Sequence, residues 1–308
     1  MLAYAARRLA AIPPTLFVIV TLAFAVVRAA PGGPFDAEQS LPPQVKANLE
    51  RAYGLDQPLA TQYLRYLSAI AHGDFGPSLK YRDLSVGALI AQGLPVSLTL
   101  GFAALVVALA LGVPLGTWAA LRRGRPVDHG IMGLAVLGVV LPSFVTGPLL
   151  VLVFGLGLHW LPVAGWQNGN PYYLVLPVMT LALPLIAYIA RLIRSSLLEV
   201  LQSDFIRAAR ARGLGSRRVI WRHALPPALL PVVSYLGPAT AFVVTGSLVV
   251  ETVFGLPGTG RYLVEGAIDR DYTLVMGMVI VYGLITLTCN LAADLVYGWL
   301  DPRVGHAY

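Results

Sequence analysis

Residues 95–120 read PVSLTLGFAALVVALALGVPLGTWAA, a stretch without a single Asp, Glu, Lys or Arg. A helix needs roughly 20 apolar residues to cross a hydrocarbon core about 30 Å thick. The apolar side chains fall on every face, whereas a membrane β-strand alternates apolar and polar residues. The stretch therefore predicts a transmembrane helix and an all-α membrane protein.

The same signal recurs along the chain and predicts one polytopic transmembrane domain over residues 1–308. The six predicted spans are residues 9–28, 95–120, 130–156, 172–194, 225–250 and 273–296. The third and fourth lie in a run of 62 residues without Asp, Glu, Lys or Arg, interrupted by a polar, turn-rich hairpin at residues 159–171. The first span is longer than the roughly 7 to 15 residues of a signal-peptide core, so we interpret it as a retained span.

The overall composition agrees with a membrane protein. Hydrophobic residues make up 57% and charged residues 12% of the 308 residues, and the mean hydropathy is +0.72. Soluble domains average about 25% charged residues. The single cysteine, Cys289, excludes an intrachain disulfide and a cysteine-based metal site.

Basic residues are unequally divided between the two sides of the predicted spans. The two termini, the second-to-third loop and the fourth-to-fifth loop carry 14 basic and five acidic residues, and the opposite connections carry eight and ten. Arg and Lys accumulate in cytoplasmic loops. We therefore expect both termini in the cytoplasm and residues 29–94 on the extracytoplasmic side.

The interiors of the predicted spans lack acidic and basic side chains, and Asp294 is expected at the cytoplasmic interface. Ion-coupled transporters generally carry ionisable groups there, so a stand-alone channel or secondary transporter is a remote alternative. The chain also lacks an HExxH metal site, a GxSxG nucleophile elbow and a P-loop. We therefore expect no enzymatic activity, metal or cofactor on this chain, and any uphill transport must draw energy from another polypeptide.

The most charged stretch is the fourth-to-fifth loop, residues 203–222, which reads SDFIRAARARGLGSRRVIWR. Ser203 or Asp204 can cap the start of a helix, and Gly213 with Gly215 can end it. One interpretation is an amphipathic helix lying on anionic lipid. The alternative is a cytoplasmic helix that contacts another protein.

This loop resembles the EAA loop of ABC-importer membrane subunits. Residues 207–209 (RAA), Gly213, His223 and residues 225–226 (LP) match its spacing. Arg207 replaces the usual glutamate and His223 the usual aliphatic residue, and both replacements resemble the peptide-transporting branch. The resemblance therefore favours the protein-contacting helix.

Further stretches carry the resemblance over nearly the whole chain. They are RAAPGGPF (28–35), YGLDQP (53–58), GDFGPSLKYRD (73–83), ETVFGLPGTG (251–260) and RDY (270–272). In this order they resemble the B-type membrane subunit of bacterial oligopeptide permeases, within the dipeptide/oligopeptide/nickel importer family. The resemblance implies a type I ABC importer permease fold with a cytoplasmic coupling helix, and location in the bacterial cytoplasmic (inner) membrane.

By that resemblance the chain forms half of a heterodimeric pathway for ATP-driven oligopeptide import. The implied partners are a C-type permease subunit, two cytoplasmic ATPase subunits that bind ATP and Mg²⁺, and an extracytoplasmic peptide-binding protein. Uptake of dipeptides, murein peptides, glutathione or nickel remains open as an alternative. Nickel is the least expected, because the predicted spans contain no histidine cluster.

Two sets of functional residues follow from the resemblance and from the loop chemistry. The expected ATPase-coupling residues are Phe205, Arg207, Ala208, Ala209, Arg210, Arg212, Gly213 and Leu214. The expected binding-protein docking or gate residues are Asp74, Glu251, Pro257, Gly258, Gly260, Arg270 and Asp271. The helical pattern in residues 42–73 either caps the spans or takes part in the docking.

Overall fold

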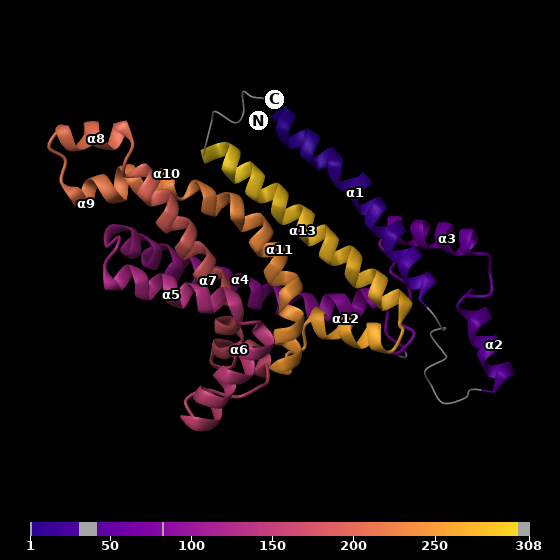
Figure 1. Ribbon diagram of the computed structural model, residues 1–308. Coiled ribbons are helices and arrows are strands. Elements are labelled where there is room, and N and C mark those ends of the chain that lie inside the picture. Colours follow the sequence, from indigo (N-terminus) through magenta and orange to yellow (C-terminus); the bar gives the residue numbers. More distant parts are fainter. Residues whose placement is uncertain (1, 31–41, 82, 301–308) are drawn as a thin grey trace.

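The structure is a computed structural model that describes residues 2–30, 42–81 and 83–300 (Figure 1). Four of its helices, α1, α4, α7 and α13, are long and apolar enough to cross a membrane, and two bent helix pairs bring the number to six if each pair is one span. The long helices are α1 (Leu2–Ala29), α4 (Val86–Leu121), α7 (Pro171–Val200), α11 (Leu230–Val253) and α13 (Tyr272–Leu300).

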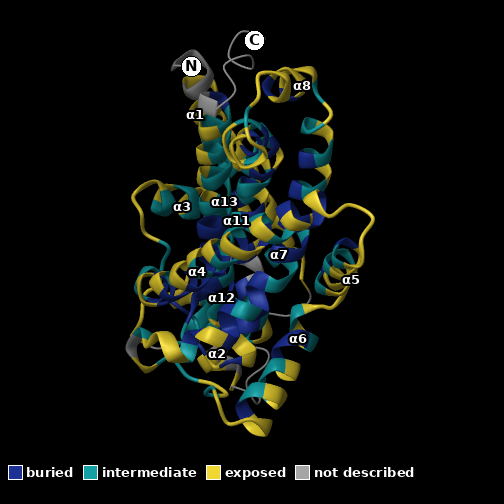
Figure 2. Ribbon diagram, turned by 90° about the vertical axis from the view of Figure 1, so that its left-hand side faces the viewer, coloured by how far each residue is buried: buried dark blue, intermediate teal, exposed yellow. Residues whose placement is uncertain are grey.

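The molecule has two distinct ends (Figures 1 and 2). The short helix α8 (Asp204–Ala211) lies at the same end as the start of α1 and the end of α13. The opposite end carries α2 (Pro43–Ala52) and α12 (Thr259–Ile268), and α3 (Leu59–Ala71) packs beside the last turns of α1. We name them the inner end and the outer end, after the sides predicted from the arginines.

The third predicted span, residues 130–156, is broken in the structure. Helix α5 (Pro126–Val140) is followed by α6 (Ser143–Leu150) and a π-helical segment (Val151–Gly157), and the chain bends by 109° between them. The bend falls at Leu141, which is extended and precedes Pro142. The helical backbone conformation is disfavoured for a residue that precedes proline. Hydropathy therefore predicted one continuous span where the structure has two helical segments.

The entry into α11 is bent as well. The chain leaves α8 through α9 (Ser216–Arg218), a π-helical segment (Val219–Ala224) and α10 (Leu225–Ala228), and it bends by 46° before α11. Pro226 and Pro227 lie in α10 and Pro231 in the first turn of α11, so several backbone N–H donors are missing here. The short helix predicted to start at Ser203 or Asp204 is thus present as α8, and several interruptions separate it from α11.

Helix α4 packs closely against α7 because glycines line the contact. A Cβ atom on Gly116 would lie 2.4 Å from the carbonyl oxygen of Ala190, and one on Gly112 would lie 2.9 Å from the side chain of Ile189. Small residues allow this approach of helix backbones in a membrane, where packing drives association. In the most apolar 18-residue stretch of α7, 61% of the residues are buried, whereas the corresponding share for α1 is 11%. Figure 2 shows α1 largely in the colours of exposed and intermediate residues.

Several helices continue beyond the predicted spans and bring charged residues with them. Helix α4 begins at Val86, capped by the Ser85 hydroxyl, instead of near residue 95. Asp128 in α5 is buried and forms a bidentate pair with Arg194 of α7, at 2.6 and 2.7 Å. Glu251 lies within α11 and is fully buried. Asp128 and Glu251 lie just outside the predicted spans, in helices that extend past them, and each is paired or hydrogen-bonded, as a buried charge requires.

Part of the predicted extracytoplasmic segment, residues 31–41, lies outside the described residues. The described remainder contains α2 and α3, as the amphipathic pattern in residues 42–73 predicted. Tyr63 of α3 shares a hydrogen bond of 2.6 Å with Thr21 and packs on Phe24 of α1. The segment is thus fixed against the first long helix.

The close contact of α4 with α7 yields a stability prediction. We expect Gly116→Ala to lower the stability by about 1–3 kcal/mol, because the added methyl group forces a backbone shift. Gly130→Ala is the matched control, since a Cβ atom there meets nothing within 4 Å. Thermal unfolding of the purified protein in mild detergent measures both, and equal melting temperatures would contradict the packing argument.

Candidate functional site

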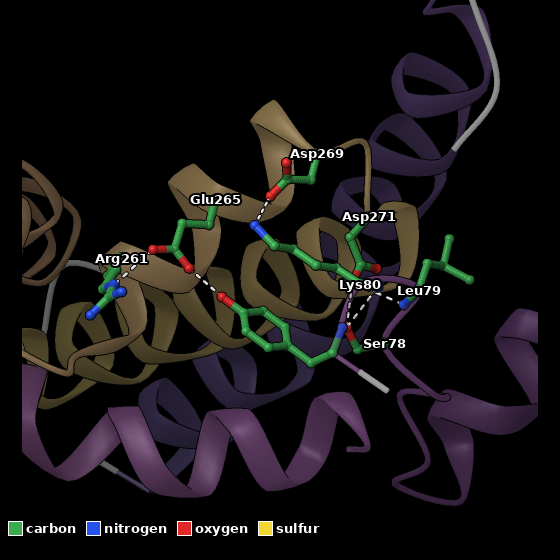
Figure 3. Close-up of polar contacts among 8 residues, drawn as sticks. Ser78, Leu79, Lys80, Arg261, Glu265, Asp269 and Asp271 are labelled. Atoms are coloured by element: carbon green, nitrogen blue, oxygen red, sulfur yellow. Dashed lines mark hydrogen bonds and ion pairs between the residues drawn. The ribbon is translucent and has the colours of Figure 1, made fainter. Parts of the chain in front are cut away.

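Asp271 organises the polar contacts of the outer end. It directly precedes α13 and is fully buried, and its two carboxylate oxygens accept five hydrogen bonds. Figure 3 shows those that come from the loop at residues 78–80. The donors are the hydroxyl groups of Ser78 and Thr273 and the backbone N–H groups of Leu79, Lys80 and Leu274. One carboxylate thus caps α13 and fixes the loop at residues 78–80.

Two surface pairs surround Asp271. Lys80 forms an ion pair with Asp269, and both side chains are partly exposed, so this pair adds little stability. Tyr81 donates to Glu265, which also accepts from Arg261 at 2.7 Å (Figure 3). Burial raises the pKa of Glu265, but the hydrogen bonds from Tyr81 and Arg261 outweigh it and hold the pKa below its ordinary value. These contacts fasten the loop at residues 78–81 to α12.

Two other predicted docking residues are near these contacts in sequence. Asp74 is close to Ser78 and Arg270 directly precedes Asp271, but both make fewer contacts than Asp271. Asp74 is exposed and its carboxylate accepts the backbone N–H of Gly76 at 2.8 Å. Arg270 has a φ of +56° and turns the chain between α12 and α13. Of the three, only Asp271 is built into the core of the outer end.

Glu251 is the centre of a second cluster, which we name the Glu251 node: Ser97, Glu251, Thr259, Gly260 and Tyr282. The Glu251 carboxylate accepts the Ser97 hydroxyl at 2.6 Å and the backbone N–H of Gly260 at 2.7 Å. Ser97 accepts the backbone N–H of Thr259 at 2.9 Å, and Tyr282 donates to the Thr259 hydroxyl at 3.1 Å. The node therefore joins α4, α11, α12 and α13 at the start of α12, where a negative charge is favoured.

The glycines around the node are required by the approach of the carboxylate. A Cβ atom on Gly258 would lie 2.3 Å from the carboxyl carbon of Glu251, and one on Gly260 would lie 2.4 Å from the Leu248 Cα. Gly258, Gly260 and Glu251 are all buried, and Pro257 is partly buried. In this arrangement a docking partner therefore cannot contact Glu251, whereas a role in a gate remains a prediction.

Sequence reasoning missed Ser97 and Thr259. Each is a single hydroxyl residue in an apolar or glycine-rich context, and such residues usually bond to their own helix. The only hint in the sequence was Glu251 itself, because a glutamate inside an apolar helix needs hydrogen-bond donors from neighbouring helices. The spacing of Ser97 from Glu251 gives no hint that the two meet.

At the inner end, α8 presents one side to the bundle and the other outward. Ile206 and Ala209 are buried in a cluster with Ala120 of α4 and Leu197 of α7. Phe205, by contrast, is 49% exposed. The exposed members of the predicted coupling set are Phe205, Arg207, Ala208, Arg210, Arg212 and Gly213.

Two details of this helix differ from the expectation. Ala209 was expected to face a partner, but it packs against the protein's own bundle, together with Ile206, which sequence reasoning missed. The alternation of Ile206 and Ala209 with charged residues is the signal for an inward face. Gly213 has a φ of +78°, so the glycine ends α8 in a left-handed conformation, and the partly buried Leu214 follows.

Among the described residues, no group of three or more His, Cys, Asp or Glu side chains is arranged to hold a metal ion. The polar clusters are instead saturated by hydrogen bonds within the chain. Such clusters join helices to one another.

The Asp271 contacts yield a second prediction. Asp271→Asn keeps the shape but loses the charge that accepts five donors, so we expect a loss of roughly 2 kcal/mol or more, because hydrogen bonds to charged groups are the strong ones. Asp269→Asn is the matched control and should cost less than about 1 kcal/mol. Thermal unfolding and amide hydrogen exchange of residues 78–80 measure the difference. Equal exchange in the two variants would show that Asp271 does not fix the loop.

Comparison with protein families places the chain among transport proteins. The model of the family described as binding-protein-dependent transport system inner membrane component matches residues 112–306. The matched part runs from the second half of α4 and includes α8, α12 and the Glu251 residue. It thus covers the inner helix and most of the outer clusters.

Individual relatives match over the whole length. The oligopeptide transport system permease protein OppB of Escherichia coli K12 is 51% identical over 304 residues, 99% of each chain. The protein of the same description from Haemophilus influenzae is 48% identical, again over 99% of each chain. The dipeptide transport system permease protein DppB of Bacillus subtilis is 43% identical over 99% of this chain and 98% of its own.

Solved structures show the same fold. A chain of the inward-facing MetNI methionine ABC transporter superimposes with a TM-score of 0.54 at 20% identity, over 69% of this chain and 96% of its own. An amino acid ABC transporter gives a TM-score of 0.50 at 20% identity, over 75% of this chain and 97% of its own. The chain therefore has an ABC permease-like fold, and it belongs to the family of binding-protein-dependent transport system inner membrane components.

Proposed function

We propose that this chain is a permease subunit of an ATP-driven importer that moves oligopeptides across the bacterial inner membrane. The observation that carries the proposal is the 51% identity to an oligopeptide permease over 99% of both chains. In this proposal a second, C-type permease subunit supplies the other half of the pathway. Both termini face the cytoplasm, as the distribution of arginines indicates.

The energy comes from partner chains. Two cytoplasmic ATPase subunits bind ATP and Mg²⁺, while this chain is non-catalytic and holds no cofactor. A peptide-binding protein on the extracytoplasmic side delivers the substrate. The 14 basic residues of the inner connections fit a side that contacts both the cytoplasmic lipid surface and partner proteins.

The exposed face of α8 is the surface we assign to the ATPase. Phe205 offers an aromatic anchor, and Ala208 has no bulk to prevent close approach. On its other face, Ile206 packs against the ends of α4 and α7. A displacement of α8 by a closing ATPase therefore moves the long helices as rigid bodies.

The Glu251 node is the element we assign to the outer gate. Helix α4 reaches from Ser97 in the node to Ala120 beneath α8, so both ends of the molecule share one helix. Motion of α4 relative to α11 and α12 changes the donors of the Glu251 carboxylate. Because a buried carboxylate needs its hydrogen bonds, the node favours discrete arrangements over intermediate ones.

Dipeptides are the second candidate substrate. The supporting observation is the 43% identity to a dipeptide permease over 99% of this chain. The difference between peptide lengths does not require different residues in this chain if the binding protein selects the substrate. Exchange of the binding protein in a reconstituted system distinguishes the candidates.

The assembly and activity test uses the tagged chain purified from its native membrane in mild detergent. We expect a second permease chain and two ATPases to remain bound, and the reconstituted complex with its binding protein to take up a labelled tripeptide only with ATP. The controls are the same uptake assay without the binding protein and the assay with ADP in place of ATP. A chain that came out alone and transported without ATP would overturn the proposal.

The coupling surface yields a separate prediction. Phe205→Ala should weaken ATPase binding about 30-fold, since truncation of an aromatic anchor at an interface costs about 2 kcal/mol or more. Phe102→Ala is the matched control, because Phe102 is 72% exposed on α4 and far along the chain from α8. Retention of the ATPase during purification and ATP-driven uptake measure both variants. Normal retention in Phe205→Ala would remove α8 from the interface.

A further inference from the structure

A cavity of about 310 Å³ lies at the outer end, apart from the Glu251 node. Its walls come from the end of α1, from α3, from the loops at residues 53–55 and 74–77, and from the start of α13. The volume is at the lower limit of small-molecule sites, which span roughly 300–1,000 Å³. Asp74, a predicted docking residue, lies in its lining, but the roles discussed above assign the cavity no ligand.

Arg28 is held in place at the cavity by two aromatic rings. Its guanidinium carbon lies 5.4 Å from the ring centre of Phe24 and 5.3 Å from that of Tyr272. Within the described part of the chain, no acidic side chain pairs with Arg28, and its buried Nε has no hydrogen-bond partner. Contacts with ring faces leave the N–H edge of the guanidinium available, and that edge matches a carboxylate or phosphate.

Two further polar atoms of the cavity lining are also buried without a partner. Gln62, 9% exposed, donates through Nε2 to the carbonyl oxygens of Leu55 at 3.0 Å and Gln57 at 2.7 Å. These bonds fix the amide, so its unpartnered Oε1 is an acceptor in need of a donor. The hydroxyl of Tyr66, one helical turn later, is likewise unpartnered. Three such atoms in one lining are rare, because buried polar groups are normally hydrogen-bonded.

The missing partners define the chemistry of a ligand. Arg28 and Tyr66 call for an anionic oxygen, and Gln62 calls for an N–H donor a few ångströms away. The last residue of a peptide carries both, as its terminal carboxylate and its own amide N–H. The aromatic rings of Phe24 and Tyr272 accept a side chain of varied shape.

We propose that this cavity binds the C-terminal residue of a peptide, with the carboxylate on Arg28 and Tyr66 and the amide N–H on Gln62. A phosphatidylethanolamine head group shares the pairing of anion and N–H donor. We favour the peptide because most of the wall comes from α3 and the two loops, which are parts of the outer cap and not of the long apolar helices. The three unpartnered atoms are closed to solvent, so a ligand reaches them only when the cavity wall opens. The inference rests on the proposed peptide transport.

The test measures binding of radiolabelled tri-alanine to the complete importer complex in phosphatidylcholine nanodiscs without its binding protein. We expect tri-alanine amide, which lacks the carboxylate, to bind about tenfold or more weakly. Arg28→Gln should cause a similar loss, and Arg51→Gln, an exposed arginine on α2 outside the cavity lining, should bind normally. Equal binding of acid and amide, or normal binding by Arg28→Gln, would overturn the proposal.

The Tyr66→Phe variant separates a loss of ligand binding from a loss caused by misfolding. It removes only a hydroxyl group that has no partner, so we expect an intact complex and about two- to tenfold weaker tri-alanine binding. Tyr188→Phe, on α7 and outside the cavity lining, is its control. If Tyr66→Phe left binding unchanged and only raised the melting temperature, the hydroxyl would have no ligand and the site would be refuted.

Two further measurements distinguish a peptide from a lipid ligand, and a failure of this inference from a failure of the proposed function. Tri-alanine binding that disappears in phosphatidylethanolamine nanodiscs, together with loss of co-purified phosphatidylethanolamine from Arg28→Gln, would assign the cavity to lipid and overturn the peptide. ATP-driven tri-alanine uptake is measured in parallel with the binding protein present. Uptake without carboxylate-dependent binding at the cavity would refute this inference alone, whereas absence of uptake would refute the proposed function.

Discussion

The hydrogen-bonded carboxylate of Glu251 is the constraint on which the outer half of the structure depends. It is fully buried within α11, where no water is available to solvate a charge. The Ser97 hydroxyl and the Gly260 backbone therefore have to reach it from α4 and α12. This requirement fixes where α12 starts and leaves room only for glycine at position 258.

Helix α4 carries this constraint through the molecule. Near one end it contributes Ser97 to the Glu251 node, and near the other it contributes Ala120 to the cluster around Ile206 of α8. Between these points Gly112 and Gly116 hold it against α7 at backbone distance. A tightly packed pair of helices transmits displacement because protein interiors resist compression, so the two ends are mechanically joined without a dedicated linking element.

The sequence predicted most of the architecture but not its contacts. Hydropathy located the long helices and loop chemistry located α8, because both signals are local. The 109° bend before Pro142 was missed, since an apolar run has the same hydropathy whether straight or folded. The burial of Glu251 and the inward position of Ile206 were missed for a different reason. Both depend on residues distant in the sequence, which no local pattern reveals.

The short stretches that carry the family resemblance acquire a physical relation in the structure. The stretch at residues 73–83 and the stretch at residues 270–272 lie far apart in the chain, but Asp271 accepts the Ser78 hydroxyl and the neighbouring backbone groups. The stretch at residues 251–260 closes on itself, because Glu251 binds the N–H of Gly260. The first two stretches thus supply the two sides of one buried carboxylate contact, and the third supplies both sides of another. A change in one side alone would leave a charge or several donors without partners, so these motifs act as pairs and not as independent signatures.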